Sequence, residues 1–288
     1  MRVERFPEPG TKVSADKFLI TGGGCAANAA VATERLGGRV SFAGPLGGPD
    51  DELSTRIVAD LRHEGINCDG VVRVAGATAS VSLILLDAEG EKTIATRRGA
   101  GLSDARPSDA EKLVSSVDAL LVDNRFPEFV TPLCEAARSR GIPVVIDLDL
   151  ATRPDDALIK HGTHVISSAE ALRGTTNVAG IEDGLRVLAE HLGGFIAATD
   201  GPAGAFWLEN KALRHLPGFK VEAVDSLGAG DAFHGAFTFA LVEGQDIAAA
   251  LRFASAAAAI KCTRFGGLTG AATRDEVEAF LARQADAR

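Results

Sequence analysis

The chain has few cysteines, and none of them lies close to another. Four cysteines are scattered over 288 residues, at Cys25, Cys68, Cys134 and Cys262, and no CxxC motif occurs. Because zinc sites and disulfide frameworks need thiols at short, regular spacings, the sequence predicts neither. This usage is typical of a protein in a reducing compartment, so we expect a cytoplasmic location.

Long hydrophobic runs and positive charge are also scarce. The Ala-rich segment 247–260 contains Arg252 and Ser255, so it indicates a buried helix rather than the roughly 18 apolar residues of a membrane span. Residues 1–7 lack the apolar core of a signal peptide. The net charge of -9 and the pI of about 5.2 do not match the basic surface of nucleic-acid-binding proteins. We therefore expect neither a membrane nor a nucleic acid among the partners.

Several catalytic motifs are missing as well. The absence of G-x-x-x-x-G-K-[ST] excludes a P-loop kinase. The absence of HExxH and G-x-S-x-G excludes a zinc metalloprotease of that type and a hydrolase with a nucleophile elbow. Any chemistry must therefore come from other motifs.

The chain does contain a regular alternation of strands and helices. A hydrophobic content of 46% over this length suits one large domain. Residues 79–97 are typical of a β-hairpin. Beyond it, the alternation predicts an α/β fold with a mostly parallel sheet covered on both faces and a ligand site beyond the carboxyl ends of its strands. The expected strands are 119–122, 142–147, 163–166 and 194–199, followed by a hairpin at 205–216, and the expected helices are 129–140, 181–192, 230–243, 247–260 and 274–284.

The most informative segment is 225–237, where Gly228, Ala229 and Gly230 precede Asp231 and an apolar run with helical spacing. A glycine-rich turn that opens a helix presents free backbone N–H groups at the positive end of the helix dipole, which favours an anion. A carboxylate there fits phosphoryl transfer, in which Asp231 takes a proton from the attacking hydroxyl. The alternative is an ordinary loop-to-helix turn with an acidic residue in its first turn.

Three further segments have both a functional and a structural interpretation. Residues 22–32 loosely match the dinucleotide fingerprint, but no clear β-α-β unit follows. The alternative is a sugar-contacting turn, in which Gly24 lets the backbone approach the ligand closely and Asn28 offers its side-chain amide. Residues 199–204 form either a simple loop or a turn that nucleotide phosphates approach. Arg125 follows an expected strand and forms either a surface ion pair or a bidentate contact with an anionic substrate.

Taken together, these segments resemble the ribokinase/PfkB family of sugar kinases. Residues 225–231 resemble its D-T-x-G-A-G-D signature, with Ser226 in place of the threonine. Residues 23–47 resemble its N-terminal signature, residues 199–201 its nucleotide-binding strand end, and residues 257–267 its C-terminal helix and loop. The resemblance covers nearly the whole chain in the family's order.

The resemblance implies a Rossmann-like α/β core with a small β lid, ATP as phosphoryl donor and Mg²⁺ bridging its phosphates. Asp231 would be the base, with the N–H groups of Gly228, Ala229 and Gly230 as the anion hole. Glu170 matches the acid of the family's N-x-x-E element, which acts on Mg²⁺ through water; Ser167 replaces its asparagine. Some members bind K⁺ near the position of Asp225. The implied nucleotide contacts are Thr199, Gly201, Gly204, Ser255 and Ala258, and the implied sugar contacts are Gly24, Asn28, Arg97, Arg125 and Asp231.

The same resemblance leaves the sugar open. Within the family, the shared stretches are most similar to sulfofructose kinase, in which an arginine at the place of Arg125 holds the sulfonate. An asparagine that helps there corresponds to Thr96, and Arg97 and Arg98 follow it. We therefore expect a ketohexose-like, anionic sugar, with a neutral sugar such as fructose or ribose, or a relative that binds without turnover, as the alternatives.

The resemblance also predicts the organisation of the chain. Residues 1–288 form one kinase domain, whose lid comprises about 1–20 and 70–99 and pairs with a second copy in a homodimer. Family members begin with a core strand that carries a sugar-binding aspartate, and no such strand precedes the lid residues here. Since a parallel sheet without an internal strand exposes unpaired backbone groups, we expect roughly 15 to 20 further residues in the natural protein.

Overall fold

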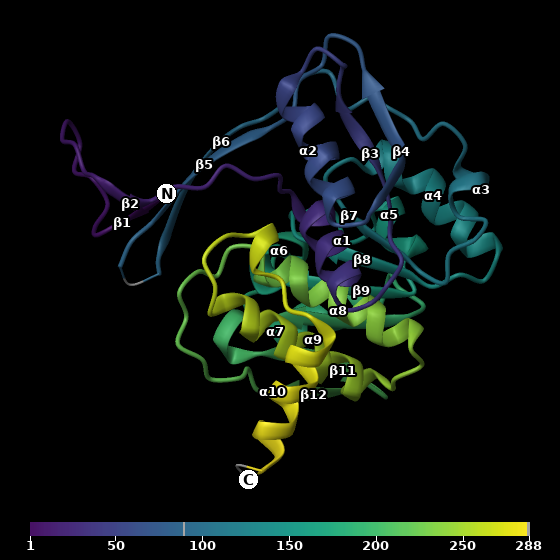
Figure 1. Cartoon of the computed structure of the whole chain (residues 1–288). Helices are drawn as coiled ribbons and strands as arrows, with labels where there is room; N and C mark the ends of the chain where they lie inside the picture. The colour runs from purple at the N-terminus through teal and green to yellow at the C-terminus, as the bar shows by residue number, and fades with distance from the viewer. Residues whose placement is uncertain (89, 287–288) are drawn as a thin grey trace.

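A six-stranded sheet forms the centre of the molecule in the computed structural model, which describes residues 1–88 and 90–286. Its order is β12-β11-β10-β9-β8-β7, parallel from β7 to β10 and antiparallel at β11 and β12 (Figure 1). The predicted α/β fold is confirmed. The strands are β7 (Leu120–Asp123), β8 (Val144–Leu148), β9 (His164–Ser168), β10 (Phe195–Thr199), β11 (Ala205–Glu209) and β12 (Ala212–Leu216).

Helices cover both faces of this sheet because its strands are apolar on both sides. Every residue of β8 is buried, and its successive side chains alternate between two cores. Val145 packs in the core under α8, α9 and α10, whereas Ile146 packs in the core under α4, α5, α6 and α7. The helices are α4 (Pro127–Ser139), α5 (Ala157–His161), α6 (Ala169–Thr176), α7 (Ile181–Ala189), α8 (Ala229–Val242), α9 (Ile247–Cys262) and α10 (Arg274–Asp286).

The segment between the N-terminal residues and this sheet forms a separate unit. Strands β3 (Ser41–Gly47) and β4 (Asn67–Val74) pair in parallel as a two-stranded sheet, connected by α2 (Glu52–His63). Residues 70–74, which the sequence analysis assigned to the lid, therefore belong to β4. Helix α1 (Cys25–Arg35) lies between this unit and α8, and the short α3 (Ala110–Leu113) packs beside α4.

A four-stranded sheet projects from the body (Figure 1). Its order is β2-β1-β5-β6, with β1 at Arg2–Val3, β2 at Ala15–Lys17, β5 at Val81–Leu86 and β6 at Lys92–Arg97. The predicted hairpin is confirmed, since β5 and β6 pair antiparallel. Near its turn, Lys92 Nζ lies 3.5 Å from Ser226 Oγ, so the hairpin reaches the segment that precedes α8.

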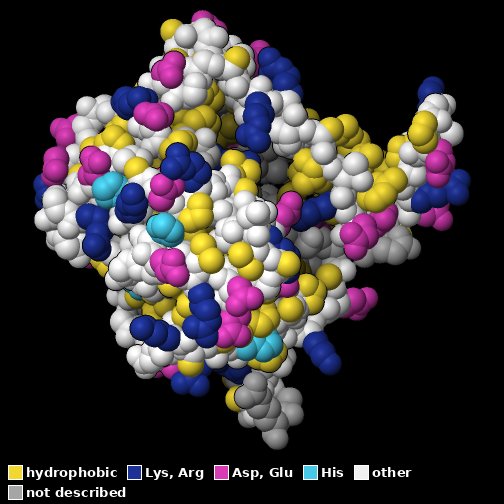
Figure 2. Space-filling view, turned by 180° about the vertical axis from the view of Figure 1, so that it is seen from behind, with side chains coloured by type: hydrophobic (Ala, Val, Ile, Leu, Met, Phe, Trp, Pro, Cys, Tyr) yellow, Lys and Arg dark blue, Asp and Glu magenta, His cyan; other side chains and the backbone are white. Residues whose placement is uncertain are grey.

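The projecting sheet carries exposed hydrophobic side chains. Val81, Leu83 and Ile94 are between 41% and 49% exposed, and Phe18 after β2 is 66% exposed. Figure 2 shows hydrophobic side chains gathered along this part of the surface. Leu83 lies on the face opposite to that of Ile94, because Leu83 is opposite Ala95 and Ile94 is opposite Ile84 in the ladder.

The helices agree with the expectation from hydropathy. The Ala-rich segment 247–260 lies within α9 and is largely buried between its neighbours. Among the described residues, none of the helices has both the length and the hydrophobicity that a bilayer crossing requires.

Candidate active site

The turn before α8 has the geometry of an anion site. Gly228 caps the helix in the left-handed conformation (φ 77°), and no side chain caps the helix. Ala229 N–H donates to Ser226 O at 3.2 Å, so it is not free, in contrast to the sequence-based expectation. The N–H groups of Gly228, Gly230 and Asp231 have no acceptor among the residues that the structure describes. These three donors remain available to a ligand at the positive end of the helix.

Helix α1 places Asn28 directly against Asp231. The Asn28 side-chain amide donates to Asp231 Oδ2 at 2.6 Å. The two helices approach closely because Gly235 has no side chain: a Cβ there would lie 2.5 Å from Ala29 O. Asn28 Oδ1 is buried and has no hydrogen-bond partner among the described residues. A buried acceptor without a partner beside a carboxylate indicates a place for a ligand donor.

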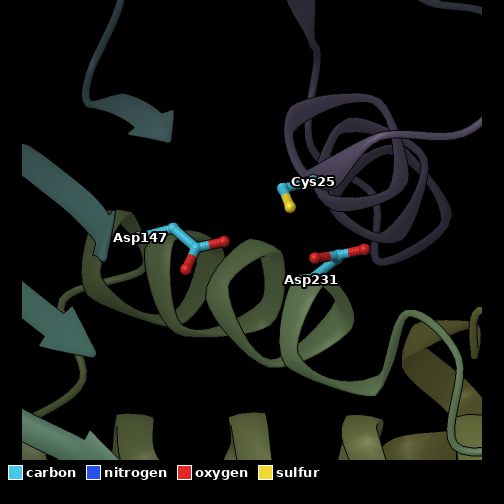
Figure 3. Close-up of side chains that lie close together, drawn as sticks. All are labelled: Cys25, Asp147 and Asp231. Atoms are coloured by element: carbon cyan, nitrogen blue, oxygen red, sulfur yellow. The ribbon is translucent and has the colours of Figure 1, made fainter. Parts of the chain in front are cut away.

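Two more groups point into the same space. Figure 3 shows Cys25 at the start of α1, Asp147 on β8 and Asp231 in the first turn of α8, with their side chains directed toward one another. One ligand atom from each lies within 4.8 Å of the others. Burial raises the pKa of the Cys25 thiol strongly, so it stays protonated. A protonated thiol is a poor ligand, and Mg²⁺ prefers oxygen donors, so this trio does not fit a magnesium site.

The site concentrates carboxylates. Burial raises the pKa values of Asp123, Asp147 and Asp231, and for Asp147 the charge of Asp231 raises the pKa further. In Asp231, hydrogen bonding from Asn28 lowers the pKa and partly opposes burial. A carboxylate whose pKa lies above its usual range is a stronger base for accepting a hydroxyl proton.

His234 lies one turn beyond the catalytic candidate Asp231. Its Nδ1 is 2.8 Å from Gly230 O, and its Nε2 is 3.2 Å from Ile166 O and 3.5 Å from Asp147 Oδ1. Burial lowers the pKa of this imidazole. His234 thus connects the first turn of α8 to Asp147 of β8 and to the middle of β9.

Arg125 lies at this site but is already paired. Its guanidinium Nη2 forms an ion pair with Asp149 and lies 3.7 Å from Cys25 Sγ. Its backbone N–H donates to Asp123 Oδ1 at 2.9 Å. The structure therefore brings Arg125 to the ligand end of β7, as expected from the sequence, but with its charge compensated by a neighbour.

The sequence analysis did not identify three of these residues. These are the acidic residues Asp123, Asp147 and Asp149, which lie in or next to the carboxylate cluster. Asp123 of β7 is the register partner of Asp147 of β8. A usable signal was present, since Asp123 and Asp147 each follow a run of apolar residues near the carboxyl end of a parallel strand.

The expected nucleotide contacts lie further along the same edge of the sheet. Thr199 ends β10 opposite Ser168 of β9, and Gly201 follows with φ 49° and open space at its Cβ position. Ser255 and Ala258 are half-buried on neighbouring turns of α9. Gly204 has a packing explanation instead, because its Cβ would lie 2.1 Å from Leu216 O.

Of the remaining expected contacts, Glu170 and Arg97 are separate from the Asp231 cluster, whereas Gly24 directly precedes Cys25 of that cluster. Glu170 lies in the first turn of α6, exposed and with no hydrogen bond or ion pair to any described residue. Arg97 ends β6 on the projecting sheet and is exposed. Gly24 caps α1 with φ 102°. Among residues 18–24, all of which the structure describes, no strand leads into this helix, so the dinucleotide interpretation of residues 22–32 is wrong.

Comparisons with known proteins agree with this architecture. The model of the pfkB family of carbohydrate kinases matches residues 1–274. The ribokinase of Bacillus subtilis is 33% identical over 281 residues, which cover 96% of this chain and 94% of the relative.

Two solved structures extend this similarity to the fold. A putative ribokinase from Agrobacterium tumefaciens is 38% identical with a TM-score of 0.93, covering 100% of this chain and 94% of its own. A fructokinase from Xylella fastidiosa, solved with bound ATP, is 26% identical with a TM-score of 0.78, covering 91% of each chain. On the family match, the sequence identity and the shared fold, this chain belongs to the pfkB family of carbohydrate kinases.

Proposed function

We propose that the protein transfers the γ-phosphoryl group of ATP to a hydroxyl of a neutral sugar, a ketohexose or pentose, with Asp231 as the base. The single observation that carries this proposal is the position of the Asp231 carboxylate at a helix N-terminus where three N–H groups, those of Gly228, Gly230 and Asp231, have no acceptor among the described residues. One group accepts the hydroxyl proton while the neighbouring donors stabilise charge on the phosphoryl oxygens.

The surrounding groups position the sugar hydroxyl. Asn28 donates to Asp231 Oδ2 and so orients the carboxylate, and its unpartnered Oδ1 offers an acceptor to a second hydroxyl. The raised pKa of Asp231 makes proton transfer from a sugar hydroxyl more favourable than it would be to an exposed carboxylate.

Charge at the site favours a neutral substrate over an anionic one. Asp123, Asp147, Asp149 and Asp231 surround the space, and Arg125 is engaged by Asp149. A sulfonate or phosphate would meet like charges and would have to displace Asp149 from Arg125. The names of the relatives, a ribokinase and a fructokinase, fit a neutral sugar as well.

The nucleotide and its metal fit the other end of the sheet edge. Gly201 has open space at its Cβ position, and Ser255 and Ala258 are small, half-buried residues of α9. The free carboxylate of Glu170 has the oxygen donors that Mg²⁺ and its waters prefer. Bound Mg²⁺ would supply positive charge to the phosphate oxygens. Gly204 does not belong to this set, because it packs against the backbone of Leu216.

The projecting sheet would act as the lid and as the dimer contact. It reaches the turn before α8 through Lys92, so it is placed to exclude water from the bound sugar. Lys92 lies on the same face of the hairpin as Ile94, which leaves Leu83 on the outward face. We infer that this outward apolar face pairs with a second copy of the chain.

Replacing the base tests the chemical step. Asp231→Asn keeps the shape of the side chain but cannot accept the proton, so kcat should fall by roughly 10²- to 10⁴-fold. Steady-state ADP release with Mg-ATP and sugar measures kcat. The matched control is Asp104→Asn, at an exposed position, which should leave kcat unchanged. A near-normal rate for Asp231→Asn would remove it from the role of base.

The pH profile tests the environment of that base. Activity requires deprotonated Asp231, and burial raises its pKa, so the acid limb of kcat/KM should lie above that of an exposed aspartate. Asn28→Leu removes a hydrogen bond that lowers this pKa, so the limb should move to still higher pH. An unchanged limb in a variant with normal thermal stability would contradict this assignment.

A substrate panel tests the neutral-sugar proposal. With ribose, fructose, fructose 6-phosphate and sulfofructose, we expect kcat/KM for a neutral sugar to exceed that for the anionic ones by roughly tenfold or more. Arg125→Ala should then reduce turnover of all substrates by a similar factor. A loss confined to anionic sugars, about 1.5–3 kcal/mol in binding, would instead make Arg125 the anchor of an anionic substrate.

Sedimentation tests the dimer. Leu83→Asp places a charge on the outward apolar face and should convert a dimer to a monomer. Val242→Asp is the matched control, because Val242 is 45% exposed but lies at the end of α8, away from the lid. A wild-type monomer, or a dimer that survives Leu83→Asp, would rule out this contact.

A further inference from the structure

A lysine is completely buried next to the turn that leads into α8. Lys261 lies in the last turn of α9, and its relative exposure is 0%. A buried ammonium is costly unless its charge and its three N–H groups are matched by acceptors. The surroundings of Lys261 provide such acceptors.

All of the partners of this ammonium are oxygen atoms from two loop segments. Lys261 Nζ donates to Asp225 O at 2.8 Å and to Arg264 O at 3.4 Å, and it lies 3.8 Å from Asp225 Oδ1. Two backbone carbonyls and a carboxylate thus surround one positive charge. The same set of hard oxygen donors would suit an alkali metal ion.

Asp225 connects this charge to the anion site. Its Oδ1 accepts from Leu227 N–H and its Oδ2 from Gly266 N–H, each at 2.8 Å. Asp225 is 1% exposed and immediately precedes the turn that ends at Gly228. The position of the free N–H groups of that turn therefore depends on a buried carboxylate, which needs a compensating cation.

A potassium ion at Asp225, which the family resemblance allows, does not fit these residues. The ammonium already occupies the oxygen donors that the ion would need. The space around its stem is also filled, because a Cβ at Gly270 would lie 3.1 Å from Lys261 Cε. Lysine and potassium carry the same single charge, so either one alone satisfies Asp225.

We propose that the Lys261 ammonium is a tethered internal cation that takes the place of a bound monovalent ion, so that this kinase works without potassium. The lysine is covalently attached and therefore always present at the site. It holds the segment 224–228 against the loop 262–270 without any contribution from the salt in solution.

The wild-type protein tests this directly in two independent ways. At equal ionic strength, the rates of sugar-dependent ADP release in KCl, NaCl and tetramethylammonium chloride should agree within about twofold. The thermal midpoint should respond in the same way to each of the three salts. The thermal measurement does not depend on the proposed substrate, so a wrong sugar cannot be mistaken for a wrong cation role. Strong stimulation by KCl over tetramethylammonium chloride, or selective thermal stabilisation by KCl, would overturn the proposal.

Two variants separate charge from volume. Lys261→Ala removes the ammonium and leaves space, so the variant should become potassium-dependent, with activity raised roughly tenfold or more by KCl and a thermal midpoint raised by about 2–4 °C. Lys261→Met removes the charge but fills the space, so KCl should restore the activity of this variant far less. Lys220→Ala, at an exposed position, should behave as wild type in every salt.

The variant results discriminate between the two roles of Lys261. Selective rescue of Lys261→Ala by KCl, in rate or in thermal midpoint, supports a cation role. Equal losses in Lys261→Ala and Lys261→Met that no salt changes would show that Lys261 acts only through packing, and would overturn the proposal. If both variants fail to fold, the salt response of the wild type still decides.

Discussion

The close packing of α1 against α8 is the constraint on which the site depends. Gly235 allows the backbone of α1 to approach α8, which brings the N-terminal turns of both helices to the carboxyl edge of the sheet. Asn28 then reaches Asp231, and Ala26 N–H donates to Asp123 Oδ2 at 3.1 Å. Two positive helix ends converge on the carboxylates of β7 and β8, which is what makes such a concentration of negative charge tolerable.

Charge compensation differs between the two ends of the same turn. On the side of Asp231, burial first and then the charge of Asp149 raise the pKa of this carboxyl, the proposed base. At the start of the turn, the buried Lys261 ammonium compensates the charge of Asp225. In the proposed reaction, the first arrangement makes Asp231 a stronger base, and the second holds in place the turn that carries the free N–H groups.

Particular elements show how far the sequence could predict this arrangement. Asp231 and its glycine turn were identifiable because the residue types needed for an anion site are contiguous in the chain. Asp147 and Asp149 were missed because a single acid after a strand is common, and only the sheet brings them to Asp231. Gly204 was assigned to the nucleotide although the structure packs it against β12. For Arg125 the sequence left an ion pair and a substrate contact open, and the structure shows the ion pair; the partner could not be predicted, since Asp149 lies on another strand connection.

The order of the residues was enough to predict the α/β fold, the projecting hairpin and the family, because each is encoded by local periodicity or by a contiguous motif. The same motif carries Asp231, the proposed base. The pairing of charges, in contrast, could be seen only in the folded chain. Arg125 is compensated by Asp149, which lies 24 positions further along the chain, and Asp225 by Lys261, which lies 36 positions further along. Electrostatic pairing depends on distance in space and on burial, and neither is written in the order of the residues.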